Sequence, residues 1–212
     1  MASVSEWIVR EYFEQQGYLV TQPGKYMVTG RPKRPEEELD LLIEHPLIAE
    51  QRLPAARLWS TADLRGVRRA VVGIYGWHTE RVYPTTLEHI PDIARLAGPE
   101  ARRAAARRLG SSEFAVILCL PRLPVSRALR DATLARLQER GVDGVLPFRL
   151  MLTDLLERVD GGKNYEKSDL LQVLRILKTY DLLKAPQLEL FVSGKQAARR
   201  KKKPAAPGPA AP

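Results

Sequence analysis

Acidic side chains beside two predicted strands are the residues best suited to chemistry in this sequence. Asp40 stands in "EELDLLIEHP", an extended segment where Asp is unusual because β-sheets disfavour it. His78 and Glu80 follow the strand "RRAVVGIYGW" in the turn "GWHTER", and Glu6 lies in the first turn of a predicted N-terminal helix. Two carboxylates can hold Mg²⁺, which polarises a phosphate and acidifies a bound water, and a histidine can act as general base.

Each of these residues also has a structural interpretation. Asp40 could pair with one of the many arginines at a sheet edge. Glu6 forms a capping box, S-x-x-E, with Ser3. His78 and Glu80 fit a polar turn at a strand end, and this interpretation is favoured over a catalytic one.

The histidines and the cysteine predict no zinc site, because His45, His78 and His89 are scattered along the chain. Cys119, the single cysteine, lies in "FAVILCLP" and is expected to be buried without a disulfide. The sequence has no apolar run of 18 residues, which excludes a membrane span, and its N-terminus resembles neither a signal nor a transit peptide. We therefore expect a soluble cytoplasmic protein.

The positive charge is concentrated at the C-terminus. The 212 residues carry a formal net charge of +9, and six basic residues in a stretch without acids leave only +3 for residues 1–194. These six are Lys195, Arg199, Arg200, Lys201, Lys202 and Lys203. The Ala-, Pro- and Lys/Arg-rich segment 194–212 is predicted to be disordered, and it could attract phosphates or only solubilise the chain.

A second basic group lies on the predicted helix "GPEARRAAARRL". It consists of Arg102, Arg103, Arg107 and Arg108. These side chains could contact a phosphate backbone. The alternative is an ordinary solvated helix face.

Periodicity predicts an α/β protein with a mixed sheet. Helices are expected at 4–16, 98–109, 125–141, 150–159 and 168–183, and strands at 18–22, 37–46, 68–77, 113–121 and 142–148, with 187–193 as a short strand or strap. This order, α-β-β-β-α-β-α-β-α-α, indicates a three-layer sandwich. We expect one domain over 1–193, in which 150–184 forms a C-terminal helical hairpin that packs on the core.

The order helix, short strand, "ELDLLI", "AVVGIYGWH", helix, buried strand resembles the PD-(D/E)XK superfamily of restriction-endonuclease-like nucleases over residues 3–148. In that family the second strand supplies an Asp, the third supplies Glu-x-Lys, and the first helix often supplies a Glu. The resemblance places Asp40 at the Asp and Glu6, or less well Glu14, at the helix Glu. It places Gly73 at the Glu and Tyr75 at the Lys of the third strand, so the acid and the ammonium are missing.

These substitutions imply a nuclease-like fold without ordinary nuclease activity. Gly73 offers no metal ligand, a tyrosine is neutral at pH 7, and Asp40 alone is a weak Mg²⁺ site. We therefore expect no catalytic residue, no resident metal and no cofactor. The expected function is binding of nucleic acid, DNA above all, or a non-catalytic role in a DNA-processing complex.

Two alternatives remain open at this point. The first is an active Mg²⁺-dependent endonuclease with a relocated site built from Asp40 and Glu80, with Glu6 and His78 as further candidates. The second is a protein–protein interaction module that binds no nucleic acid. A homodimer and an association with the nucleoid are compatible with all three.

Overall fold

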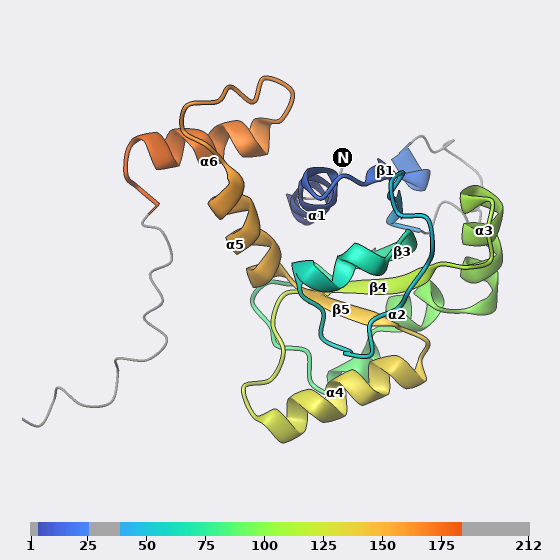
Figure 1. The fold of residues 1–212 in the computed structure, drawn as a ribbon. Helices are drawn as coiled ribbons and strands as arrows, with labels where there is room; N and C mark the ends of the chain where they lie inside the picture. The colour runs from blue at the N-terminus through green and yellow to red at the C-terminus, as the bar shows by residue number, and fades with distance from the viewer. Residues whose placement is uncertain (1–3, 26–38, 184–212) are drawn as a thin grey trace, which may run out of the picture.

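The computed structural model describes residues 4–25 and 39–183, which form an α/β fold around a five-stranded mixed sheet. The strands are β1 (Leu19–Thr21), β2 (Leu41–Glu44), β3 (Arg69–Ile74), β4 (Ala115–Leu120) and β5 (Gly144–Pro147), and they lie side by side in sequence order (Figure 1). The pairs β1–β2 and β2–β3 are antiparallel, whereas β3–β4 and β4–β5 are parallel. The predicted α/β class and mixed sheet are confirmed.

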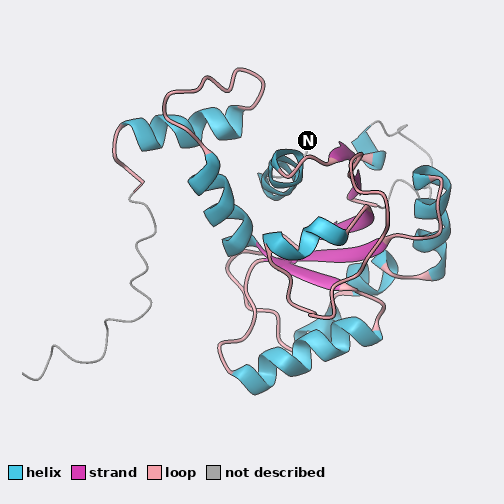
Figure 2. Ribbon diagram, in the orientation of Figure 1, coloured by secondary structure: helices cyan, strands magenta, loops and turns pink. Residues whose placement is uncertain are grey.

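Helices cover both faces of the sheet (Figure 2). Helix α1 (Val4–Gln15) and helix α5 (Phe148–Arg158) pack on one face, where Leu41, Val72 and Ile117 point. Helices α2 (Pro91–Leu96), α3 (Pro99–Leu109) and α4 (Arg127–Glu139) pack on the other, where Leu42 and Val71 point. Short 3₁₀ turns lie at Pro23–Lys25, Thr61–Gly66 and Thr86–His89.

The two central strands are apolar on both sides, as expected for strands covered by helices on both faces. Every residue of β4 is buried, and β3 is buried from Ala70 to Gly73. Cys119 of β4 is buried as predicted. Burial, and to a lesser extent the charge of Asp40, raises the pKa of its thiol. The residue is therefore an inert part of the core beside Met151.

Several element boundaries differ from the sequence prediction. Helix α2 was not predicted, because "PDIARL" is only six residues long, begins at a proline and is followed closely by Gly98. Strand β3 ends at Ile74, three residues earlier than expected, and the Tyr75 N–H still donates to the Cys119 carbonyl of β4 just beyond it. The predicted segments 187–193 and 194–212 lie outside the described residues. In the described ranges no helix is long and apolar enough to cross a membrane.

The C-terminal helices α5 and α6 (Asp169–Thr179) are tied to the body by polar contacts. Lys178 donates from Nζ to the carbonyl oxygens of Leu156 and Val159, 2.7 and 2.6 Å away, and so caps the end of α5. Ser168 Oγ accepts from the Leu171 N–H at the start of α6 and donates to the Glu11 carboxylate on α1, 2.6 Å away. Helix α6 is therefore attached both to the end of α5 and to the first helix.

Glu11 should make stability depend on pH. Burial raises its pKa above the ordinary value of 4.5, partly offset by the Ser168 hydrogen bond. The folded protein therefore holds this proton more tightly than the unfolded chain. The stability that Glu11 contributes is full below its unfolded pKa and falls as pH rises through the folded pKa. Glu11→Gln keeps an acceptor for Ser168, so we expect a smaller loss of unfolding free energy between pH 4 and pH 7.

Urea unfolding at several pH values in this window measures that difference. Glu157→Gln removes the same charge from the exposed surface of α5 and controls for net charge. An identical pH dependence in the wild type and Glu11→Gln would contradict the assignment.

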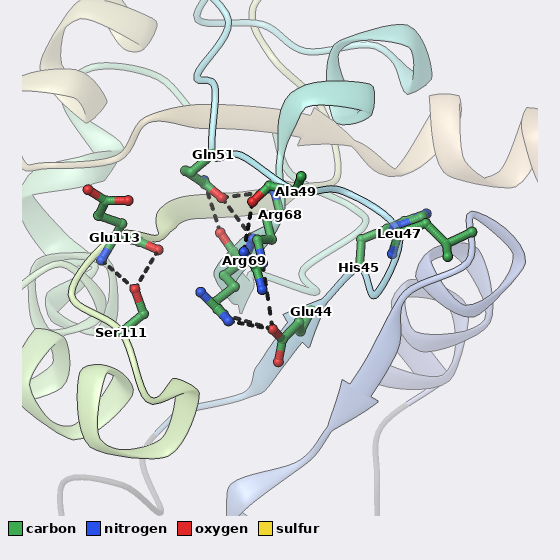
Figure 3. Close-up of polar contacts among 9 residues, drawn as sticks. All are labelled: Glu44, His45, Leu47, Ala49, Gln51, Arg68, Arg69, Ser111 and Glu113. Carbon is green, nitrogen blue, oxygen red and sulfur yellow. Dashed lines mark hydrogen bonds and ion pairs between the residues drawn. The ribbon is translucent and has the colours of Figure 1, made fainter.

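The amino end of β3 is closed by a network of hydrogen bonds and an ion pair (Figure 3). The Gln51 side chain accepts from the N–H groups of Arg68 and Arg69, both 2.8 Å away, and donates to the Arg69 carbonyl. Arg69 forms an ion pair of 2.7 Å with Glu44 at the end of β2. Because these polar groups hydrogen-bond and ion-pair with one another, they stabilise this end of the sheet.

Candidate nucleic-acid interface

The opposite edge of the sheet is the expected place for a ligand. Strands β3, β4 and β5 are parallel, so their carboxyl ends meet there, and ligands of open α/β sheets bind outside these ends. The loop after β3, the turn after β4 and the first turn of α5 form this edge. We call it the carboxyl edge, defined by Asp40, Tyr75, Trp77, His78, Arg122 and Arg149.

Asp40 lies at this edge, where β2 diverges from β3. Leu41, the first residue of β2, is the β2 residue nearest this edge that still pairs with β3, and it lies opposite Val72. One residue beyond, the Asp40 side chain replaces the backbone partner: its Oδ2 accepts from the Ile74 N–H at 2.8 Å. The carboxylate therefore holds the end of β3, a role that a charge-assisted hydrogen bond performs well.

Gly73 has no room for a side chain. A β-carbon built on it would lie 2.2 Å from a methyl carbon of Leu96 on α2. A side chain at this position would therefore run into the apolar cluster beneath α2. The resemblance puts the family's glutamate at this position, and here the space is occupied by leucine.

Tyr75 is half-buried on the same side of the sheet as Gly73 and packs against that cluster. Burial, with a smaller contribution from the Glu80 carboxylate, raises the pKa of its phenol. The phenol therefore stays neutral at physiological pH. Glu80 is exposed and acts on Tyr75, whereas the charge of Asp40 acts on Cys119, which is buried against α1 and α5.

His78 fastens the loop after β3 to two helices. Its Nε2 lies 3.0 Å from Ser5 Oγ in the first turn of α1, and its ring meets the Phe148 ring edge-on with 4.6 Å between centroids. Gly76 lets the loop approach, because a β-carbon there would lie 2.5 Å from the same Ser5 oxygen. Ser5, 8% exposed, is thus enclosed between α1 and the loop. The contact holds the loop against α1, and the enclosed Ser5 hydroxyl is not accessible as a nucleophile.

Between these fixed residues Trp77 points into solvent. Its side chain is 66% exposed. Arg149 follows Phe148 at the start of α5, and Arg122 lies in the turn after β4, where its carbonyl accepts from the Val82 N–H. Both arginine side chains are exposed, and within residues 4–25 and 39–183 neither forms a hydrogen bond or ion pair. The edge therefore offers an aromatic face and two cations.

The other nominated acids and histidines do not join this group. Glu6 accepts from the Gln22 amide at 3.1 Å, and His45 contacts the Gln16 carbonyl near β1. His89 is exposed at the end of a 3₁₀ turn. Among the described residues no group of three or more His, Cys, Asp or Glu side chains is arranged to hold a metal ion.

The arginines of α3 lie far from the carboxyl edge, because the last turn of α3 leads into the amino end of β4 (Figure 1). Arg102 is turned inward: it donates to the carbonyl oxygens of Ala97 and Gly141 and lies over the Phe114 ring. Arg103, Arg107 and Arg108 are exposed. The tail residues Arg199, Arg200, Lys201, Lys202 and Lys203 lie outside the described part of the chain.

Sequence reasoning missed Ser5, Phe148, Arg122 and Arg149. A weak signal existed for Ser5, because it is a small polar residue on the helix face that also carries Ile8, Val9 and Tyr12. Arg122 and Arg149 each follow a predicted strand of the parallel pair, so the carboxyl-end rule pointed to them. Comparisons of the chain with protein-family models, with curated proteins and with solved structures find no match.

Proposed function

We propose that this protein binds nucleic acid through the carboxyl edge of a restriction-endonuclease-like fold that has lost its cutting chemistry. The observation that carries the proposal is the composition of that edge. Exposed Trp77 shares this edge with Arg122 and Arg149, whose exposed side chains form no hydrogen bond or ion pair within residues 4–25 and 39–183, while the strand position at which the resemblance expects a metal-binding acid is Gly73, closed off by Leu96. Arginines bind phosphates by charge and counterion release, and an indole adds stacking.

The arrangement of the elements supports the fold assignment. The structure has the order helix, three strands, helices, strand on which the resemblance was based, with α2 as an addition. Asp40 lies beside the end of β3, where the resemblance puts the Asp of the second strand. The role of Asp40 here is a hydrogen bond to the backbone, which keeps the strand in place without a metal.

Fluorescence anisotropy with labelled oligonucleotides tests the proposal. We expect the double variant Arg122→Ala/Arg149→Ala to bind about 10-fold more weakly or worse. The salt slope of the affinity should fall by about 2, one for each phosphate contact. The matched control is Arg103→Ala/Arg108→Ala, which removes two exposed arginines from the opposite end of the sheet.

A second control separates the body from the tail. In a full-length variant, Arg199, Arg200 and Lys201–Lys203 are replaced by glutamine. The proposal requires this variant to retain binding that still depends on Arg122 and Arg149. The proposal would be overturned if this variant lost all nucleic-acid binding. It would also be overturned if Arg103→Ala/Arg108→Ala weakened binding and Arg122→Ala/Arg149→Ala did not. If the wild-type protein bound no nucleic acid, the proposal would be wrong and the protein–protein interaction module would be the remaining hypothesis.

A further inference from the structure

We infer that Trp77 is a stacking platform for an unpaired nucleobase, so that the ligand of the carboxyl edge is a single-stranded segment rather than continuous duplex. The inference rests on the proposed function and adds the class of nucleic acid. Its starting observation is that two thirds of an indole side chain stands in water on a loop whose neighbouring residues are both held.

The loop presents the indole in a fixed place. On one side of Trp77, Gly76 lies so close to Ser5 that no side chain fits between them. On the other side, His78 is hydrogen-bonded to Ser5 and packed against Phe148. The loop is therefore attached to α1 and to α5 at once. A platform that is ordered before binding loses little conformational entropy when a base stacks on it.

The surroundings of the indole favour a nucleotide over an apolar partner. Arg149 follows the residue that His78 contacts, and the Arg122 backbone pairs with Val82, five residues after Trp77. Helix α5 has no acid in its first turn and no side-chain cap, so its positive end adds to the charge of Arg149. An aromatic face beside cations is the arrangement that binds a base and its phosphate together.

Stacking on Trp77 selects for bases that are free on one face. Within a duplex each base already stacks on its neighbours above and below, so an indole reaches a base only at an end, a gap or a single strand. The hydrogen-bonding edges of the base take no part in this contact. We therefore expect little sequence preference at this position.

The test compares oligodeoxyuridylate, oligouridylate and relaxed covalently closed plasmid, which offers neither ends nor unpaired bases. Full-length protein should prefer the single strands, and the DNA and RNA arms identify the sugar. Trp77→Ala should weaken single-strand binding about 10-fold. Trp77→Phe keeps an aromatic face and should retain most of the affinity, while the quenching of tryptophan emission on binding disappears.

Trp7→Ala is the matched control. Trp7 is 48% exposed, and it lies two residues from Ser5 on α1, about 200° around the helix and so away from the loop. Its replacement should leave the affinity unchanged. Thermal unfolding of each variant confirms that the fold is intact.

The outcomes separate this inference from the proposed function. The stacking inference is wrong if Trp77→Ala binds single strands as tightly as the wild type does. It is also wrong if the wild type binds the closed plasmid as tightly, per nucleotide, as it binds the single strands. Neither result contradicts the proposed interface. If Arg122→Ala/Arg149→Ala also binds normally, the interface itself is wrong.

Discussion

Replacement of Gly73 by alanine should lower the unfolding free energy by about 1–3 kcal/mol, the usual cost of overpacking a core. The new β-carbon would lie 2.2 Å from Cδ2 of Leu96 and 3.2 Å from its Cγ. Leu96 is itself buried in the cluster beneath α2, so it can move only by displacing other core residues. Urea unfolding measures the effect.

A double-mutant cycle tests the cause of this loss. Leu96→Ala leaves a cavity, and the alanine at position 73 should then cost less than it does in the wild type. Gly161→Ala is the matched control, because its nearest non-adjacent atom would be 3.8 Å away and its backbone needs no positive φ. Equal costs of Gly73→Ala in both backgrounds would contradict the assigned overlap.

The same overlap bears on any attempt to introduce the residues that the resemblance expects on the third strand. Gly73→Glu/Tyr75→Lys would place the family's two residue types at the positions that the resemblance gives them. The larger glutamate meets Leu96 before its carboxylate can approach Asp40. We expect an unstable protein without Mg²⁺-dependent cleavage of plasmid DNA.

Gly144→Ala should destabilise the protein by about 3 kcal/mol, at the upper end of overpacking effects. A β-carbon on Gly144 would lie 2.2 Å from both Cδ2 and Cε2 of Trp59, and an indole cannot bend away as a leucine methyl can. Trp59 is fully buried, and its Nε1 donates to the Ala56 carbonyl at 2.8 Å. It also pairs with the outer edge of β5 through Val145.

Unfolding curves and the near-ultraviolet circular dichroism of the buried indole measure this second effect. Trp59→Leu/Gly144→Ala provides the rescue, because a smaller and more flexible side chain leaves space for the methyl group. The double variant should be more stable than the sum of the two single losses predicts. A Gly144→Ala protein as stable as the wild type would contradict the packing described.

The fold was predictable where burial dominates the sequence. The unbroken apolar runs of β3 and β4 could belong only to central strands, and the helical periods of α1 and α4 were clear. Helix α2 was not predictable, because six residues give too little periodicity to distinguish a helix from a turn. Its importance here comes from Leu96, which fills the space above Gly73, and only the assembled structure reveals this packing.

The candidate site was predictable only in part. The strand pattern predicted the position of Asp40, but it did not predict that the Asp40 carboxylate accepts a hydrogen bond from the Ile74 N–H. Ser5 and His78 are 73 residues apart, and no local pattern indicates that they meet. For the arginines of α3, the helical period predicted their element, but not that Arg102 would turn inward and donate to the Gly141 carbonyl.

Asp40 carries a lesson for annotation by motif. Its carboxylate fastens the end of β3, so selection for a folded protein is sufficient to retain an acid there after any enzymatic need has gone. A genome survey that counts this aspartate as a mark of activity would take a residue that holds the end of a strand for a metal ligand. Surveys of this kind should also weigh the third strand, where Gly73 lies beneath Leu96 and leaves no room for a second acid.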